Sequence, residues 1–297
     1  MVYAPDGKSL VCEFCSRSQA LGGQRTPEQD FFTAMATSKG HNKPTSMQLF
    51  HCEGCGAEFI LAPQELSVIC SYCGSIHVIS QSRDLAAPDA ILPVSIDQQE
   101  AGNKLTTWMT ENKVKLARQG DLPRSLFLPV WSFDIVGNVP WSGLVLKDKQ
   151  KVPVSGEKSI LYHDIVVPAT KKLSSLLPTV LQGFTISSCI PYEPGYLAGW
   201  PAEVHSIALS EAALEARRVA VVRLRAEIIS DLPHVMDLRY PTSAISADRF
   251  KLVLVPVWLS VISQEGKLTP AVINGVTGAV TTEIRARGIL DKLLGSR

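Results

Sequence analysis

Apolar side chains recur after residue 88 with the spacings of strands and of two amphipathic helices. The first helix is predicted to begin after Asp97, because Glu100 follows at the spacing of a capping box, and to fade near Lys115. Its apolar face consists of Ala101, Leu105, Trp108 and Met109. One apolar face of this kind is typical of a helix that packs against a core.

The second helix is predicted from Ser210, which serves as its N-cap, to about Ile229. Its apolar face consists of Leu214, Val221, Leu224 and Ile228. The charged residues on this helix are Arg217, Arg218, Arg223, Arg225, Glu211, Glu215 and Glu227. Arginines can contact phosphates, but these charges nearly balance, so the pattern favours a solvated, ion-paired helix.

Strands flank the two helices in the same order. They are predicted at residues 91–94, 126–135, 139–146 and 159–167, then at 203–209, 251–262 and 269–273. Turns are predicted at Gly137-Asn138 and at Glu265-Gly266. The residues at 128–131, Leu-Pro-Val-Trp, are echoed at 255–258 by Val-Pro-Val-Trp. We therefore predict an α+β fold with an antiparallel-sheet domain, residues 89–297, built from a duplicated strand-helix-strand-strand unit with halves 89–168 and 169–297.

Residues 1–88 carry a different pattern, in which cysteines occur as Cys-x-x-Cys pairs. Two of these pairs are complete knuckles, formed by Cys52, Cys55, Cys70 and Cys73. Neighbouring glycines allow backbone amides to turn toward the sulfur atoms without a Cβ clash. The spacing predicts a rubredoxin-like zinc ribbon at residues 50–80. Its Zn²⁺ would be structural, because four thiolates leave no open position for a substrate.

The segment between these two knuckles is predicted to form a hairpin, with strands at 57–62 and 66–69 and a turn at 63–65. This ribbon is expected to have a core of its own. Replacement of one ligand, as in Cys52→Ser, is therefore expected to unfold residues 50–80 and to leave the remainder of the chain intact.

A third pair, Cys12 and Cys15, is a candidate for two further metal ligands, and it follows an apolar strand as Cys70 does. A zinc site needs about four ligands, so this first ribbon is incomplete. Three explanations stay open: the chain begins after a missing upstream pair, His41 or His51 completes the shell, or the pair is vestigial. We expect this pair to be only partly metallated.

Composition limits the classes of function. The 297 residues include 29 Lys or Arg and 28 Asp or Glu, so no chain-wide basic field exists to hold a polyanion. Residues 1–89 contain six basic and nine acidic side chains. Six of the seven cysteines occur in pairs and no signal-peptide pattern precedes them, which indicates metal ligation in a cytoplasmic protein. No apolar run is long enough to predict a transmembrane helix.

The sequence contains no phosphate-binding loop and no zinc-protease or serine-hydrolase motif. His163, His205 and His234 occur singly, without a visible catalytic partner. Cys189 lies between Ser188 and Ile190 and is expected to be an inert core residue. Tryptophans at 131, 141, 200 and 258 could form a stacking platform, but their apolar neighbours favour burial. We therefore predict that the chain is not an enzyme.

The chain resembles a poorly characterised bacterial zinc-ribbon family with paired ribbons and an α+β domain. The residues that carry the resemblance are those at 52–73, 91–94, 128–133, 196–200 and 272–278. Members are sometimes labelled as relatives of the primosomal replication helicase. Because this chain has no nucleotide-binding loop, we do not expect it to have helicase activity. The resemblance implies two complete ribbons, so the lone pair at Cys12 and Cys15 departs from the family pattern.

These observations favour a non-enzymatic zinc-ribbon adaptor or scaffold that mediates protein–protein interaction. The alternative is a nucleic-acid-binding accessory factor of replication or transcription, because zinc ribbons recur in such proteins. The partner is expected to be another protein. Because acidic side chains outnumber basic ones in residues 1–89, we favour the adaptor over the nucleic-acid-binding factor.

We predict that single-stranded and duplex nucleic acids bind no tighter than about 10⁻⁵ M at physiological salt, and that ATP is not hydrolysed. The physical reason is the acidic balance of residues 1–89 and the compensated arginines of the second helix. Fluorescence anisotropy at two salt concentrations measures this. Submicromolar binding that weakens with salt, and that falls in Arg217→Ala and Arg218→Ala, would contradict the prediction.

Overall fold

The computed structural model describes residues 1–4, 7–21, 26–37, 45–63, 65, 67–76, 78–118, 120–264 and 266–283. These residues form a mixed α+β fold that is mostly sheet, as predicted. The α-helices among them are α1 (Phe31–Thr37), α2 (Gln98–Asn112), α3 (Leu177–Leu181) and α4 (Leu209–Asp231). Short 3₁₀ turns lie at Ile186–Ser188, Pro194–Leu197 and Thr242–Ala244. No helix in these ranges combines the length and apolar character needed to cross a bilayer.

Two long strands, β10 (Arg124–Lys147) and β15 (Ile245–Gln264), form the centre of a 14-stranded sheet and pair antiparallel. Strand β11 (Gln150–Pro168) pairs with β10, and β16 (Lys267–Asn274) pairs with β15. The other strands of this sheet are β4 (Gln29–Asp30), β5 (Thr45–Cys52), β6 (Glu58–Ile60), β7 (Val78–Leu85), β8 (Ala90–Ile91), β9 (Lys115–Leu116), β12 (Ile190–Pro191), β13 (Ala202–Glu203), β14 (Met236–Arg239) and β17 (Val280–Thr282). A separate three-stranded sheet contains β1 (Val2–Tyr3), β2 (Ser9–Val11) and β3 (Ser18–Ala20).

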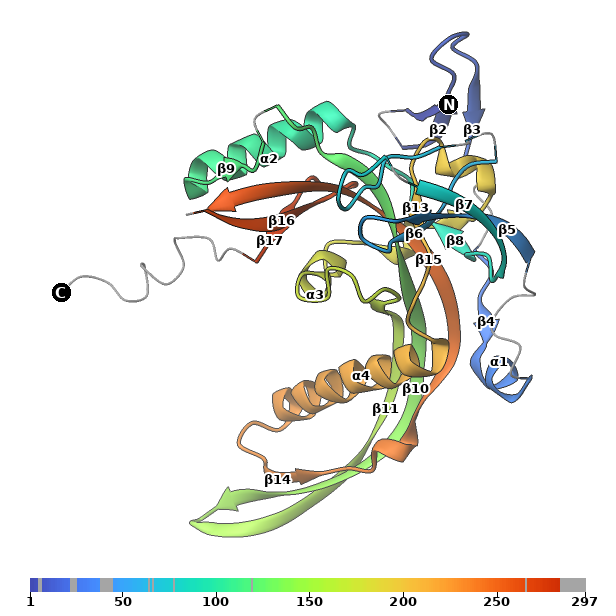
Figure 1. Ribbon diagram of the computed structural model, residues 1–297. Helices are drawn as coiled ribbons and strands as arrows, with labels where there is room; N and C mark the ends of the chain where they lie inside the picture. Colours follow the sequence, from blue (N-terminus) through green and yellow to red (C-terminus); the bar gives the residue numbers. More distant parts are fainter. Residues whose placement is uncertain are drawn as a thin grey trace, which may run out of the picture.

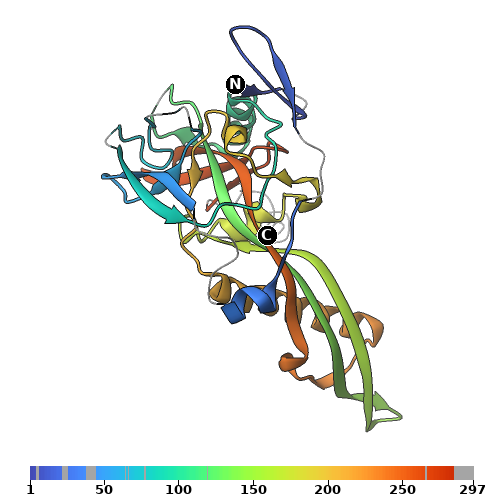
Figure 2. The same ribbon diagram turned by 90° about the vertical axis from the view of Figure 1, so that its right-hand side faces the viewer.

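Strands β10 and β11 extend beyond the body as a long arm, which Figures 1 and 2 show projecting from the remainder of the molecule. The predicted turn at Gly137-Asn138 is wrong, because β10 continues through both residues. A Cβ at Gly137 would lie 2.3 Å from the carbonyl oxygen of Ala244, so this glycine permits close strand contact. The chain reverses at Asp148 and Lys149, whose φ values of 50° and 65° suit a two-residue hairpin turn.

Helix α4 packs along the arm through small side chains. Its buried residues are Ala212, Ala213, Ala216, Ala220, Leu224 and Ile228. The alanines allow the helix axis to approach the sheet closely, which turns the helix so that Leu214 is 65% exposed. The prediction of Leu214 on the buried face is therefore wrong. The predicted N-cap Ser210 is also wrong, because Ala208 is the N-cap and no side chain caps the helix.

The first helix agrees better with its prediction. The carboxylate of Asp97 accepts a hydrogen bond from the backbone N–H of Glu100 at 2.7 Å, so the predicted cap is confirmed. Helix α2 ends at Asn112, and Lys113 follows in the left-handed conformation. Lys113 therefore ends the helix slightly before the predicted end near Lys115.

The predicted halves of the larger domain interlock. Strand β8 of the first half runs parallel to β15 of the second, and β13 of the second half runs parallel to β10 of the first. The indole N–H of Trp131 donates to the carbonyl of Ile207 at 3.0 Å, just before α4. The indole N–H of Trp258 donates to the carbonyl of Ile96 at 2.9 Å, just before α2. Each tryptophan thus ties a central strand to the start of the other half's helix.

We predict that Trp131→Phe and Trp258→Phe each lower the free energy of unfolding by about 1–3 kcal/mol, because each substitution leaves a backbone carbonyl without its hydrogen-bond donor. Urea denaturation measures the change. Trp141→Phe is the matched control, since this ring is only half-buried and no described hydrogen bond uses its indole N–H. A loss in the control equal to that of the other two variants would show that ring volume, not the hydrogen bond, is responsible.

Candidate metal centre

The cysteine pairs lie in tight turns that share one hydrogen-bond pattern. The Cys52 N–H donates to the carbonyl of Ala57 at 2.9 Å, and the Gly56 N–H donates to the carbonyl of Cys52 at 2.8 Å. The same two bonds, with the same lengths, recur in the turn that begins at Cys70. Gly56 and Gly74 have φ values of +68° and +74°, where a side chain would be strained.

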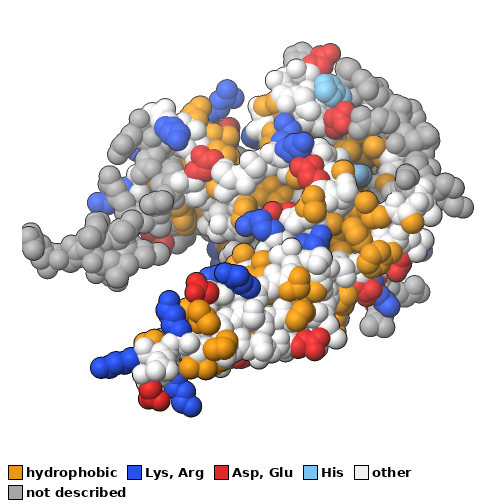
Figure 3. Space-filling model, turned by 90° about the horizontal axis from the view of Figure 1, so that it is seen from below, with side chains coloured by type: hydrophobic (Ala, Val, Ile, Leu, Met, Phe, Trp, Pro, Cys, Tyr) orange, Lys and Arg blue, Asp and Glu red, His pale blue; other side chains and the backbone are white. Residues whose placement is uncertain are grey.

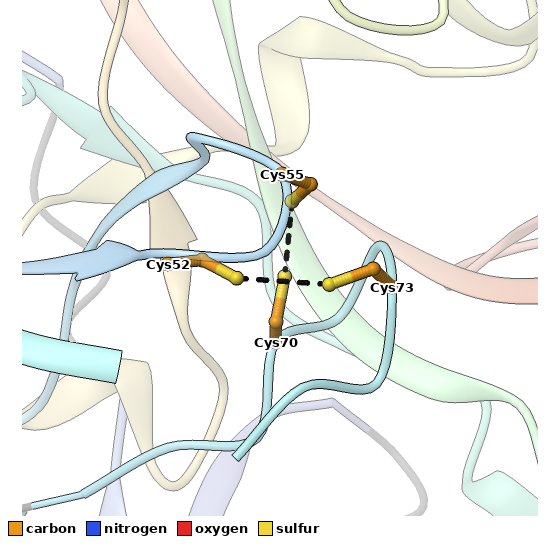
Figure 4. Close-up of side chains that lie close together, drawn as sticks. All are labelled: Cys52, Cys55, Cys70 and Cys73. Atoms are coloured by element: carbon orange, nitrogen blue, oxygen red, sulfur yellow. Dashed lines mark hydrogen bonds between the residues drawn. The ribbon is translucent and has the colours of Figure 1, made fainter. Parts of the chain in front are cut away.

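These two knuckles bring four sulfur atoms together (Figure 4). The ligand atoms of Cys52, Cys55, Cys70 and Cys73 all lie within 4.8 Å of one another. The Sγ atoms of Cys52 and Cys73 are 3.6 Å apart, and those of Cys55 and Cys70 are 3.5 Å apart. Tetrahedral coordination with metal–sulfur bonds of about 2.3 Å requires sulfur separations of about 3.8 Å. The four cysteines can therefore hold a metal ion.

The environment acts on these thiols in opposite directions. Burial raises the pKa values of Cys55 and Cys70. Burial acts in the same direction on Cys52, but backbone N–H groups of Cys55 and Gly54 outweigh it and lower its pKa to about 7. The knuckle amides thus stabilise a thiolate at one corner of the cluster. A bound cation would favour deprotonation at all four corners.

The strands around the cysteine knuckles differ from those predicted for a zinc ribbon. The first knuckle itself is the hairpin turn between β5 and β6, and β5 also pairs with β7, which follows the second knuckle. Strand β6 confirms part of the predicted strand at 57–62. The predicted strand at 66–69 is wrong for residues 67–69, and residue 66 lies outside the described residues. Because β7 supplies the backbone pairing for β5, the segment between the knuckles need not form a ribbon strand.

The region of the predicted ribbon shares its hydrophobic core with the larger domain. Cys52, Cys70 and Phe59 are fully buried and belong to one cluster with Leu126 and Val255 of the central strands. Strand β6 also pairs with β13 of the larger domain. The expectation that the ribbon has a separate core is therefore wrong, and the predicted boundary near residue 88 does not divide the hydrophobic core.

Buried polar contacts fix the second knuckle against the larger domain. Tyr72 donates to Glu203 at 2.5 Å, and Thr170 donates to the other carboxylate oxygen at 2.8 Å. The Nζ atom of Lys172 donates to the carbonyl of Cys55 at 3.2 Å and lies 5.2 Å from the centre of the Tyr72 ring. Burial raises the pKa of Glu203. One network thus connects both knuckles to the base of the arm.

Arg124, at the start of β10, holds the same knuckle from another side. Its guanidinium donates to the carbonyls of Ser71 at 2.9 Å and Tyr72 at 3.2 Å. The Ser71 hydroxyl donates in turn to the carbonyl of Ser125 at 2.7 Å. Sequence reasoning missed Arg124, Glu203 and Lys172 because each is far from the cysteines along the chain. No local spacing signalled these contacts.

The Cys12 and Cys15 pair adopts the same turn. The Cys12 N–H donates to the carbonyl of Arg17 at 2.9 Å, and the Ser16 N–H donates to the carbonyl of Cys12 at 2.8 Å. Ser16 takes the glycine position with a φ of +55°. Backbone N–H groups of Cys15 and Phe14 lower the pKa of Cys12. This pair is therefore arranged as half of a metal site.

No third ligand joins that pair within the part of the chain that the structure describes. The four-cysteine cluster is the one group of three or more metal-ligating side chains found there. His51 instead lies 3.8 Å from Glu58, measured from Nδ1 to the carboxylate, and His41 lies outside the described residues. The described structure therefore brings Cys52, Cys55, Cys70 and Cys73 together and leaves Cys12 and Cys15 apart from them.

The remaining candidates have ordinary surroundings. Cys189 is buried, as predicted, and burial raises its pKa to about 12. His163 is mostly exposed, and its Nδ1 lies 3.1 Å from Asp134. The ring of His205 meets the buried Trp131 edge-on. No family model, curated protein or solved structure matches this chain.

We predict one tightly bound metal ion per chain, and we predict that Cys70→Ser removes it and destabilises the whole fold. Because Cys70 is fully buried in the shared core, the free energy of unfolding should fall by more than about 3 kcal/mol. Elemental analysis and urea denaturation followed by tryptophan fluorescence measure the two effects.

Cys12→Ser is the control and should change neither metal content nor stability appreciably. A Cys70→Ser protein in which the larger domain unfolds at an unchanged urea concentration would contradict the shared core. Absence of metal from freshly purified, reduced protein would contradict the metal site.

Proposed function

We propose that this chain is a non-enzymatic zinc-ribbon adaptor or scaffold that docks a protein partner. One observation carries the proposal: a four-thiolate site lies beside two large aliphatic side chains that face solvent. Ile69 and Ile76, which flank the second knuckle, are 57% and 73% exposed. A saturated thiolate site has no open coordination position for a substrate, so its role is to hold this surface in shape.

Zn²⁺ is the ion that we propose for the site. Four thiolates in tetrahedral arrangement suit zinc, which has no redox chemistry of its own and closes such sites structurally. None of the cysteines in the described residues forms a disulfide. Reduced thiols of this kind are maintained in a reducing compartment such as the cytoplasm, which is the location that we propose.

Ile69 and Ile76 lie on either side of the turn that the second knuckle forms. The hydrogen bond from the Cys70 N–H to the carbonyl of Ser75 closes the turn immediately inside them. Tyr72 of this knuckle donates to Glu203, and its ring lies 5.2 Å from the Nζ atom of Lys172, so both contacts help to keep the knuckle backbone in place. An apolar pair on a rigid turn can bind a partner at little cost in conformational entropy.

We further propose that the scaffold derives from a duplicated strand-helix-strand-strand unit. The support is the matched pair of bonds made by Trp131 and Trp258, each to the carbonyl before the opposite helix. The reciprocal parallel pairing of β8 with β15 and of β13 with β10 adds to it. A scaffold of two interlocked units resists relative movement, which suits a docking platform.

The alternative function, a nucleic-acid-binding accessory factor, has less support. Base stacking needs exposed aromatic faces. Of the four tryptophans considered as a stacking platform, Trp131, Trp200 and Trp258 are buried, with exposed fractions of 1%, 8% and 6%, and Trp141 is half-buried. The protein-docking proposal is therefore preferred.

We predict that Ile69→Ser combined with Ile76→Ser reduces recovery of a protein partner about tenfold, because it removes the apolar contact. The measurement is affinity isolation of the tagged native protein at moderate salt after nuclease treatment, followed by quantitative mass spectrometry. Leu268→Ser, which alters a comparably exposed side chain on β16, is the control and should have no effect.

Metal content should stay unchanged in the double variant, because neither residue is a ligand. Loss of all association upon nuclease treatment of the unaltered protein would contradict the adaptor and favour the accessory factor.

A further inference from the structure

The hairpin of β2 and β3 carries the Cys12 and Cys15 pair at its tip. Val11 pairs with Ser18, so residues 12–17 form the turn between the two strands. Figures 1 and 2 show this hairpin projecting from the body near the N-terminus, and Figure 3 shows the molecule from below. Cys15 is exposed and Cys12 is partly exposed. The pair is therefore accessible to another molecule.

The sulfur of Cys12 is held in the same way as the first sulfur of each knuckle in the four-cysteine cluster. Backbone N–H groups of Phe14 and Cys15 donate to it, and the Cys15 side chain also interacts with that sulfur. The N–H groups at the equivalent positions, two and three residues further along the chain, donate likewise to Cys52 and Cys70. The hairpin thus presents two sulfur atoms in the geometry of a metal knuckle.

The aromatic ring between these two cysteines is a second, independent observation. Phe14 is 98% exposed, although it stands at the position that Tyr72 takes in the second knuckle. The Tyr72 ring stacks on Phe59, which follows the first knuckle, with the ring centroids 6.2 Å apart. In the four-cysteine cluster, the facing half of the site therefore covers this aromatic side chain. Phe14 has no such cover within the described residues.

We propose that the same hairpin of a second copy supplies the missing half, so that Cys12 and Cys15 of two chains bind one Zn²⁺. A structural zinc site takes four ligands, and two knuckles related by a two-fold axis can place four sulfur atoms at the corners of a tetrahedron. Binding releases the thiol protons to solvent, and each thiolate donates an electron pair to the ion. This inference goes beyond the docking function proposed above and does not depend on it.

Ligand supply, charge and apolar surface favour a second copy as the occupant. No third ligand joins the pair within the part of the chain that the structure describes. Each tip carries one acidic and one basic exposed side chain, Glu13 and Arg17, so two tips meet without net like charge. A two-fold axis allows Glu13 of each chain to face Arg17 of the other. The two Phe14 rings would lose solvent exposure in the same contact.

The shared ion is held less tightly than an ion in the four-cysteine cluster. All four ligands of the cluster belong to one chain, whereas two chains must lose translational freedom in order to share an ion. Protein purified without added metal is therefore expected to retain only the ion of the cluster. The shared site fills when Zn²⁺ and the chain are both supplied at higher concentration.

The test uses the full chain under reducing conditions, with the four-cysteine cluster already loaded with Zn²⁺. Sedimentation at increasing protein concentration, with and without added Zn²⁺, measures association. We expect added Zn²⁺ to convert monomer to dimer, and a chelator too weak to empty the cluster to reverse the change. Co²⁺ supplied in place of the added Zn²⁺ should give a thiolate charge-transfer absorption that saturates at about half an ion per chain.

Cys12→Ser and Cys15→Ser should each remain monomeric and take up no additional ion, because two of the four ligands are lost. Ser18→Ala, an exposed change of similar size on β3, is the matched control and should dimerise like the unaltered chain. His41 lies outside the described residues, and His41→Ala should also dimerise unchanged. Circular dichroism and retention of the first ion establish that each variant is folded.

A chain that stays monomeric at saturating Zn²⁺ would overturn the proposal. Uptake of one further ion per chain without dimerisation, lost in His41→Ala, would overturn it in favour of a site within one chain. A dimer that a reductant abolishes and a chelator does not would overturn it in favour of a disulfide between chains. A dimer that Cys12→Ser leaves intact would place the contact elsewhere on the molecule and overturn it equally.

Discussion

Most of the described fold is built on the antiparallel pairing of β10 with β15. These strands are apolar on both faces where they cross the body, so each face must be covered. The two cysteine knuckles, with α3, cover one face, while α2 and α4 pack at other points along the same strands. Because the strands are longer than the body, their extension with β11 forms the arm. A metal site and a helix far apart in sequence therefore share one rigid support.

This arrangement determines what a metal ion bound at the four cysteines would contribute to stability. In a free-standing ribbon, metal binding stabilises only the ribbon. Here Cys52 and Cys70 lie in the core that includes Leu126 and Val255, and Glu203 of β13 accepts a bond from Tyr72 inside the second knuckle. Loss of a metal ion bound at these cysteines would leave buried thiols in a core that must rearrange. The free energy of binding such an ion would therefore also stabilise the base of the arm.

Features set by local chemistry could be predicted from the sequence. The four-cysteine cluster, the Asp97 cap and the burial of Trp131 and Trp258 each follow from neighbouring residues. Features set by distant contacts could not. Gly137 has the local signature of a turn, and only the carbonyl of Ala244 beside it explains its place in a strand.

Helix α4 shows the same limit in another form. Periodicity places Leu214 with the apolar residues, but four alanines pack more closely against the sheet and turn Leu214 outward. The helix then has apolar side chains on two sides, and the core needs only one of them. Because the apolar residues of α4 lie on two sides of the helix, the sequence does not follow a single helical period. The prediction of one amphipathic face therefore placed Leu214 on the wrong side.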